Sequence, residues 1–286
     1  IDKLTTKELD TSAGYFTNLT NSTITGDAKA RVGKTTSTSR PDQRMFFMKD
    51  TKVGGNLDAS SETGYIHLDG GSVGGDATLA GNTRGDGNMG HIIIGYKGND
   101  KEVILSDKTA AQHSTSIGGV IKATAKRGHR SDRPELAKGD ILAYSDGNLV
   151  FKGGSAEDNL IADSGKNILI NRTSSGYTNT NTTVGKDLIL NAKGSNAIID
   201  VQVGNNSVIN SAEGYNSIDK LTTKELDTSA GYFTNLTNST ITGNAKARVG
   251  KTTSTSRPDQ RMFFMKDTKV GGNLDASSET GYIHLD

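Results

Sequence analysis

The segment Val53-Gly54-Gly55-Asn56-Leu57 recurs in looser form along the chain. Its relatives are Val73-Gly74-Gly75-Asp76, which is followed by Leu79, and Val184-Gly185-Lys186-Asp187-Leu188. Each copy places an apolar residue before Gly, Asn, Asp or Lys, and another apolar residue soon after. Gly, Asn and Asp favour tight turns, and the apolar residues on either side are spaced as in strands. We therefore predict that each copy is a turn that leads into a short β-strand.

The same alternation of turn residues and apolar runs continues through the rest of the sequence. Apolar residues stand two apart or cluster in threes and fours, as in Ile92-Ile93-Ile94 and Ile168-Leu169-Ile170. Ile141-Leu142-Ala143-Tyr144 is followed by an Asp-Gly turn and a second apolar run, which is typical of two strands joined by a tight turn. The stretch from Leu4 to Phe16 contains several Thr residues and a Ser-Ala-Gly break, which disfavour a helix. The pattern predicts an all-β protein.

A long internal repeat divides the chain. Residues 1–69 reappear as residues 218–286, and the replacement of Asp27 by Asn244 is the only difference. The period is 218 minus 1, or 217 residues, whereas one repeat of a solenoid takes roughly 20–50 residues. We therefore interpret residues 1–69 and 70–217 as one module and residues 218–286 as the start of a second. Both ends are expected to be cut points in a longer protein with several such modules.

The composition favours a thin structure over a thick globular core. Apolar residues are 32% of the chain, aromatic residues are 5%, Trp is absent and Gly contributes 35 of 286 residues. A compact domain of one module's length would normally bury more large side chains than this. Disorder is the competing interpretation for a polar chain, but only 3 Pro, a net charge of +1 and many β-branched clusters oppose it.

Composition also narrows the function. The balanced charge does not support nucleic-acid binding, which usually leaves a basic stripe. No run approaches the roughly 20 apolar residues of a membrane-spanning helix. The chain has no Cys, so disulfides and thiolate metal sites are excluded, and stability outside a cell would have to come from hydrogen bonding and intertwining of chains.

The polarity of the predicted strands suggests an assembly of several chains. Many strand-sized runs consist of Thr, Asn and Ser, and such strands need partners on both edges to satisfy their backbones. Three chains wound about one axis would provide these partners around a narrow apolar centre. The predicted fold is therefore an all-β, elongated, fibrous homotrimer, an intertwined shaft of the β-helix or β-prism kind built from tandem modules.

Several segments resemble the shafts of bacteriophage tail fibres and tail spikes. Leu4-Thr5-Thr6-Lys7-Glu8-Leu9, with the apolar residues that follow as far as Ile24-Thr25-Gly26, is similar to a strand pattern of these fibres. The stretch from Ala125 to Leu142, with a basic arm and a Pro before Gly-Asp-Ile-Leu, resembles a second fibre motif. The stretch from Ser39 to Phe47 is similar to a variant of that motif. The chain lacks the His-x-His metal motif of distal tips and a C-terminal folding chaperone, so the resemblance is to a shaft.

The resemblance implies a homotrimer with a non-enzymatic, structural role in the virion. The shaft of the tail fibre or whisker would space or display a host-recognition tip. Its partners would be its own copies, other tail or baseplate proteins and, through a tip outside these residues, a host receptor. Its location would be the virion and the extracellular space after assembly in the host cytoplasm. No cofactor is expected. The alternative is a tandem-repeat bacterial surface adhesin or extracellular filament, and the third hypothesis is a spike that cleaves carbohydrate.

Five apolar residues are the candidates for packing about the trimer axis. Their spacing of 5, 7, 3 and 5 residues fits neither a helix face nor one alternating strand, so successive members should lie on different short strands. Around a threefold axis each residue would meet two copies of itself. The candidates are Leu4, Leu9, Phe16, Leu19 and Ile24.

Four other patterns are candidates for sites of chemistry. Gly33-Lys34-Thr35 lacks the earlier Gly of a phosphate-binding loop, because that position is Ala28. Arg84-Gly85-Asp86 is an integrin-type tripeptide in a Gly-rich stretch, where chance accounts for it. His67 is the best candidate for an axial ion in a trimer, although no His pair has ligand spacing. Carbohydrate cleavage would need two carboxylates in a groove, and the acidic residues are scattered among turns: Asp107, Asp140, Asp146, Glu157 and Asp158. We predict no catalytic residues and no enzyme activity.

Overall fold

The chain folds into a tall stack of β-strands. The computed structural model describes residues 1–14, 16–33, 44–62, 65–81, 91–94, 115–117, 121–125, 128–131, 135–137, 140–145, 148–151, 153–173, 176–177, 181–250 and 261–286. Within these ranges the secondary structure is all-β, which confirms the predicted class. The same residues contain no helix that could cross a membrane.

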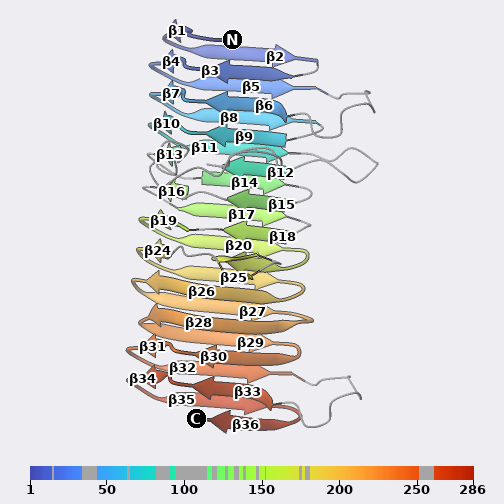
Figure 1. Cartoon of the computed structure of the whole chain (residues 1–286), viewed down its shortest axis with the longest axis vertical. Coiled ribbons are helices and arrows are strands. Elements are labelled where there is room, and N and C mark those ends of the chain that lie inside the picture. Colours follow the sequence, from blue (N-terminus) through green and yellow to red (C-terminus); the bar gives the residue numbers. More distant parts are fainter. Residues whose placement is uncertain are drawn as a thin grey trace.

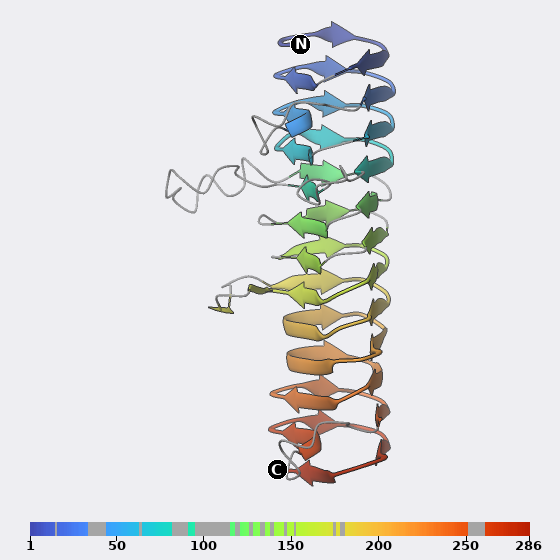
Figure 2. The same cartoon turned by 90° about the vertical axis from the view of Figure 1, so that its right-hand side faces the viewer.

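Three strands in succession make one coil, and the coils lie on top of one another (Figures 1 and 2). The central strands of the coils form a twelve-stranded sheet. They are β2 (Leu9–Ala13), β5 (Ala28–Val32), β8 (Leu57–Ser61), β11 (Ala77–Gly81), β14 (Ile121–Ala125), β17 (Ile141–Ser145), β20 (Leu160–Ser164), β25 (Leu188–Ala192), β27 (Asn206–Ser211), β29 (Glu225–Ala230), β32 (Ala245–Val249) and β35 (Leu274–Ser278).

The other two strands of each coil contribute to a single sheet of 22 strands. The third strands of the coils are β3 (Thr17–Thr20), β6 (Arg44–Lys49), β9 (Tyr65–Asp69), β12 (His91–Ile94), β15 (Gly128–Ser131), β18 (Asn148–Phe151), β21 (Ile168–Ile170), β26 (Asn196–Val203), β28 (Tyr215–Thr223), β30 (Phe233–Thr237), β33 (Arg261–Lys266) and β36 (Tyr282–Leu285). The short first strands are β1 (Thr5–Thr6), β4 (Thr23–Ile24), β7 (Lys52–Val53), β10 (Ser72–Val73), β13 (Thr115–Ile117), β16 (Glu135–Ala137), β19 (Gly154–Ala156), β24 (Thr182–Val184), β31 (Thr240–Ile241) and β34 (Lys269–Val270). In two further coils the first strand is continuous with the third strand of the preceding coil, at residues 201–203 of β26 and 221–223 of β28. A separate hairpin joins β22 (Arg172–Thr173) to β23 (Gly176–Tyr177).

The register reveals a short repeat beneath the long one. Leu9 pairs with Ala28, and Leu57 pairs with Ala77, so each residue meets its partner one coil further along the chain. All pairings between the described coils are parallel, and longer coils accommodate insertions, as between Ala77 and Ile121. Nine steps of the twelve-stranded sheet separate β2 from β29, its copy in the second module. The long period is therefore a group of coils whose sequences have diverged, and a coil without insertions has the length of about 20 residues that is usual for a short solenoid repeat.

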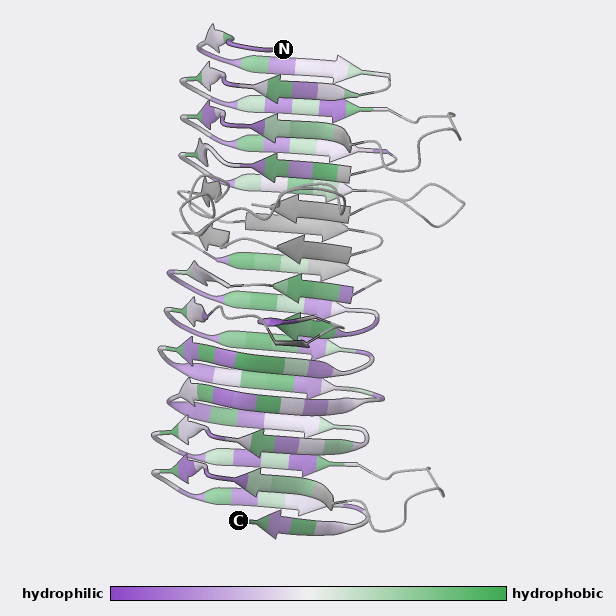
Figure 3. Cartoon of the chain, viewed as in Figure 1, coloured by the Kyte–Doolittle hydropathy of each residue, from purple (hydrophilic) through white to green (hydrophobic). Residues whose placement is uncertain are grey.

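Side chains alternate between a narrow interior and the solvent. In β8, Leu57, Ala59 and Ser61 are buried, and Asp58 between them is exposed. Alternating apolar and polar bands along the strands follow this pattern (Figure 3). Ala at the centre of β5, β8, β17, β20 and β32 keeps the coil narrow, and larger side chains such as Phe46 and Ile66 fill the interior from the third strands. One chain thereby builds a long core from few large residues, with a smaller cluster of Ala247, Val249 and Phe263 near its C-terminal end.

The strand edges are paired within this one chain. Each strand of an inner coil has a parallel neighbour in the coil before it and another in the coil after it, as β8 has in β5 and β11. The sequence argument for three intertwined chains is that polar strands would otherwise lack partners. Polar strands do not need other chains for this purpose, because the stacking of coils within one chain supplies their backbone hydrogen bonds.

Left-handed residues make the corner after several of the third strands. Asn21, Asp50, Asn171 and Asn238 have φ values from 47° to 55° at this corner, and Gly70 has φ 76°. Asn, Asp and Gly tolerate this conformation better than other residues, which explains why they bound the apolar runs of the sequence. The recurring turn residues are thus a consequence of coil geometry.

We expect Gly74→Ala to lower stability by about 1–3 kcal/mol, the usual cost of overpacking. A Cβ at Gly74 would overlap the backbone carbonyl of Gly54 in the preceding coil, and backbone cannot rotate away as a side chain can. Gly14→Ala is the matched control, because no atom lies within 4 Å of the position of its Cβ. Urea denaturation followed by circular dichroism measures both variants. Equal effects would show that the close approach of Gly74 to Gly54 is unimportant.

Candidate functional site

The five residues predicted for a trimer axis fall in different environments. Leu19 and Ile24 have no exposed surface within their own chain, and Leu9 packs half-buried against the same core. Leu4 is half-buried, and Phe16 is 51% exposed. A side chain with no exposed surface in one chain has none left to place against another. Leu19 and Ile24 therefore pack inside the coil stack and not on a trimer axis, whereas contact of Leu4, Leu9 and Phe16 with other chains stays a prediction.

The other candidate motifs have structural partners or lie outside the described residues. The N–H of Gly33 donates to the carbonyl oxygen of Ala13 (2.8 Å), so it serves the hydrogen bonding between coils. His67 is buried, and its ring lies 5.1 Å from that of Phe47. Asp140 accepts two hydrogen bonds from Asn159. The Arg-Gly-Asp tripeptide, Lys34-Thr35, Asp107 and Asp146 belong to the residues that the structure does not describe.

Asp and Asn side chains connect coils at the corner before the central strands. The N–H of Asn56 donates to Asp27 Oδ1 (2.7 Å), and the N–H of Asp76 donates to Asn56 Oδ1 (2.9 Å). The same bond runs from Asn159 to Asp140, from Asp187 to Asn159, from Asn206 to Asp187, and from Asn273 to Asn244. We call this set the corner ladder. It satisfies one backbone donor at each of these steps with an oxygen that either Asp or Asn provides.

The corner ladder accommodates the single difference between the two copies. Asp27 and Asn244 are both exposed. Each uses its Oδ1 as an acceptor for the residue one coil further on, Asn56 or Asn273. Because this bond needs only an oxygen, the loss of charge leaves the contact unchanged. The strands of the two copies accordingly occupy equivalent positions, such as β5 and β32, or β8 and β35.

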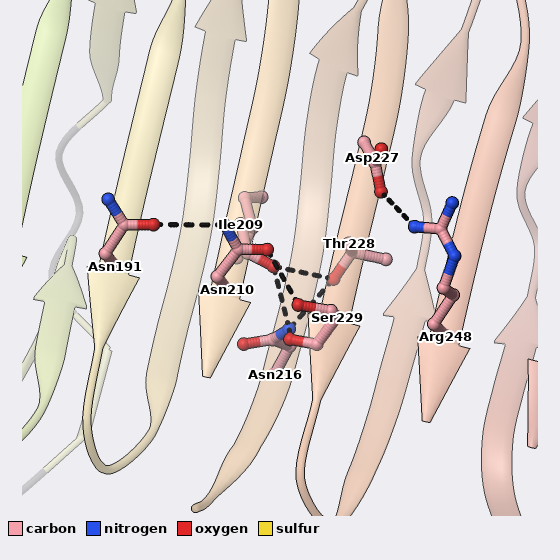
Figure 4. Close-up of polar contacts among 8 residues, drawn as sticks. All are labelled: Asn191, Ile209, Asn210, Asn216, Asp227, Thr228, Ser229 and Arg248. Atoms are coloured by element: carbon pink, nitrogen blue, oxygen red, sulfur yellow. Dashed lines mark hydrogen bonds and ion pairs between the residues drawn. The ribbon is translucent and has the colours of Figure 1, made fainter. Parts of the chain in front are cut away.

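A second line of polar contacts crosses the outer face of the twelve-stranded sheet (Figure 4). Asn191 Nδ2 donates to Asp163 Oδ1 (2.7 Å), Asn210 Nδ2 donates to Asn191 Oδ1 (3.0 Å), and Ser229 Oγ donates to Asn210 Oδ1 (2.7 Å). We call these four residues the face ladder. They are in register on β20, β25, β27 and β29. Each side chain holds the next, so the face ladder ties coils together from outside.

Ion pairs supplement these contacts at the surface. Arg248 Nη1 lies 3.1 Å from Asp227 Oδ1, and in the first copy Arg31 Nη1 lies 3.3 Å from Asp10 Oδ1. Figure 4 shows the first of these pairs. Lys186 Nζ lies 2.7 Å from Asp158 Oδ1, and this hydrogen bond raises the pKa of Lys186. All these groups are well exposed, so each pair contributes little stability. These ion pairs lie in water on the outside of the stack and join neighbouring coils.

Polar side chains also replace apolar ones in part of the interior. Asn196, Asn216, Thr228 and Thr234 are all 0% exposed, and we call them the junction layer. Asn216 Nδ2 donates to the carbonyl oxygens of Ile209 (3.1 Å) and Ser229 (2.8 Å) and to Thr228 Oγ1 (2.8 Å). Asn196 Nδ2 donates to Asn216 Oδ1 (2.9 Å). Within the described residues, Asn196 Oδ1 and Thr234 Oγ1 have no hydrogen-bond partner.

These arrangements are suited to holding coils in place. Where the structure describes the chain, no group of three His, Asp or Glu side chains is placed to bind a metal ion. Asp140 accepts hydrogen bonds from Asn159 of the next coil, and Asp158 forms an ion pair with Lys186. The chemistry of the ladders is hydrogen bonding between successive coils.

Comparison with known proteins gives no match: no family model, curated protein or solved structure is similar to the chain at a significant level.

Sequence reasoning finds the strands and turns but misses the ladders. From the sequence, the Asn or Asp before Leu57, Ala77 and Leu188 is interpreted only as part of a turn. A search for Asn or Asp that recurs once per coil, just before a strand, would find the corner ladder. The junction layer has no such signal, because Asn and Thr in a polar chain do not reveal which of them face inward.

Proposed function

We propose that the chain is a structural shaft segment of a viral tail fibre or whisker, which spaces or displays a host-recognition tip. The single observation that supports this most is the uninterrupted parallel pairing of coils along one axis. Coil-to-coil hydrogen bonds, reinforced by the corner and face ladders, resist bending and stretching. A stiff segment of this kind holds a tip at a fixed distance from its base and needs no catalytic residue.

A tandem-repeat surface adhesin or extracellular filament is the second candidate. The observation that favours it is the pairing of strands within a single chain, since a filament on a cell surface can consist of one polypeptide. In the fibre hypothesis three such chains associate into a homotrimer at the virion, in contact with tail or baseplate proteins. The number of chains in the assembly therefore distinguishes the fibre hypothesis from the adhesin hypothesis.

Sedimentation equilibrium of the purified chain tests the trimer. The fibre hypothesis predicts a species of three times the 30.1 kDa chain mass, and the adhesin hypothesis predicts a monomer. Labelling with antibodies raised against the chain tests the location independently. Labelled fibres on virions support the proposal, whereas label on the surface of uninfected cells would replace it with the adhesin. A globular particle in electron micrographs would overturn both.

A further inference from the structure

The boundary between the two modules lies inside one strand. β28 includes residues 217 and 218, so the first module ends and the second begins within it. On one side Asn216 and Ile218 pair with Asn196 and Ile198 of β26. On the other side Asn216 pairs with Thr234 of β30. The register is the same before and after the boundary, and no linker separates the modules.

We propose that tandem modules fuse into one uninterrupted stack, in which the partner at the end of each module is the next copy of the same module. The inference rests on the proposed role as a shaft and adds its construction rule. A module spans nine steps of the twelve-stranded sheet, from β2 to β29. With about 4.8 Å between neighbouring strands, each module adds about 43 Å of length. Because a module contains a whole number of coils, every module starts at the same point of a coil.

Matched residues of the two copies show what a neighbouring coil covers. Ile66 and Leu68 of β9 have no exposed surface, because β12 lies against them. Their copies Ile283 and Leu285, in the last strand of the chain, are 41% and 54% exposed. The surface that β36 presents is therefore the one that a further coil covers in the first copy.

An aromatic pair crosses the module boundary as well. Phe233 of the second module stacks on Tyr215 of the first, with ring centroids 4.8 Å apart and planes at 5°. Phe16 is the copy of Phe233 and is 51% exposed. A module that precedes another thus supplies a ring to the Phe of its successor, and the contact recurs at every boundary of an array.

The junction layer determines the register at the boundary. Asn196, Asn216 and Thr234 follow one another in register on β26, β28 and β30, and the next position is the apolar Phe263. A slip by one coil would bury an amide against apolar side chains and leave its hydrogen bonds unmade. Buried polar groups specify register in other repetitive assemblies for the same reason. In an array of nearly identical modules, this layer distinguishes the correct boundary from its neighbours.

Solution scattering on two proteins tests the construction rule. The 286-residue chain is compared with the same chain extended by one further module. We expect the longest dimension to increase by about 43 Å at an unchanged cross-section. An increase well below this value with a thicker cross-section, or a distribution of bent particles, would overturn the inference. Either of these results leaves the shaft hypothesis open. Antibody label on the surface of uninfected cells would replace the fibre with the adhesin and would leave the continuous stack unaffected.

Thermal unfolding of the extended protein tests the boundary at one residue. Asn216→Ala removes the hydrogen bonds that the buried amide makes at the junction and should lower the single Tm by about 5 °C. Gln202→Ala, on the exposed face of the neighbouring strand β26, is the control and should leave Tm within about 1 °C. Equal Tm values for both variants would mean that the boundary is not part of the cooperative stack. If Asn216→Ala does not fold, the length measurement on the unaltered proteins still decides.

Discussion

Replacing Leu19 by Asp should destabilise the chain by more than about 4 kcal/mol. Leu19 has no exposed surface, and its burial alone contributes roughly 1.5–3 kcal/mol. A carboxylate at the same place would lie among apolar side chains and would cost several kcal/mol more. Because Leu19 packs within its own chain, the loss should not depend on protein concentration. Urea denaturation at two concentrations measures it.

Asn18→Asp is the matched control for Leu19→Asp. Asn18 is the preceding residue in β3 and is exposed, so a charge there remains in water. We expect its effect to stay within about 0.5 kcal/mol. If Leu19→Asp instead leaves a folded chain that only loses its association with other chains, Leu19 faces a trimer axis and the interior position is incorrect.

Phe46→Ala should destabilise the chain by about 3–5 kcal/mol. Phe46 is among the largest side chains with no exposed surface, and it lies in register with Thr17 on one side and Ile66 on the other. Its removal leaves a cavity that a stack of hydrogen-bonded coils cannot collapse, because neighbouring strands are held at a constant spacing. Thermal and urea denaturation both measure the loss.

Phe16→Ala provides the comparison within the same copy. Phe16 is 51% exposed, so its truncation should cost no more than about 1 kcal/mol. Both Phe residues are equally visible in the sequence, and Phe16, not Phe46, is among the residues predicted to face a trimer axis. A larger loss for Phe16 than for Phe46 would restore that prediction.

Phe16 and Phe46 show where sequence reasoning stops. The spacing of Leu4, Leu9, Phe16, Leu19 and Ile24 correctly assigns them to several short strands, since these residues lie on or beside β1, β2, β3 and β4. The spacing does not tell which strands stack on which. Without the coil register, the apolar residues lack partners in one chain, and three chains are invoked to supply them.

The coil repeat escapes detection for a physical reason. A coil requires an inward apolar residue at certain positions, an oxygen acceptor at the corner and a residue that tolerates positive φ after the third strand. Several residue types meet each requirement, as Asp27 and Asn244 do at the corner, and as Asn21, Asp50 and Gly70 do after the third strand. Insertions also lengthen some coils, such as the one that begins with β11 and leads to β14. The repeat of about 20 residues is therefore weak in the sequence, and the repeat of 217 residues is the one that an alignment of the chain with itself detects.

The amino-acid sequence is enough to predict that this protein is all-β and that its strands are short and bounded by Gly, Asn and Asp, and it shows that one module is copied in tandem. These properties follow from local preferences, because turns and strands are selected by neighbouring residues. The folded chain alone shows that the strands stack as coils, that Leu19 and Ile24 are interior, and that Asn216 is buried at the module boundary. Parallel pairing joins residues that are distant in the chain, as Leu9 is from Ala28, and which of them meet depends on the register of the whole stack rather than on any local pattern.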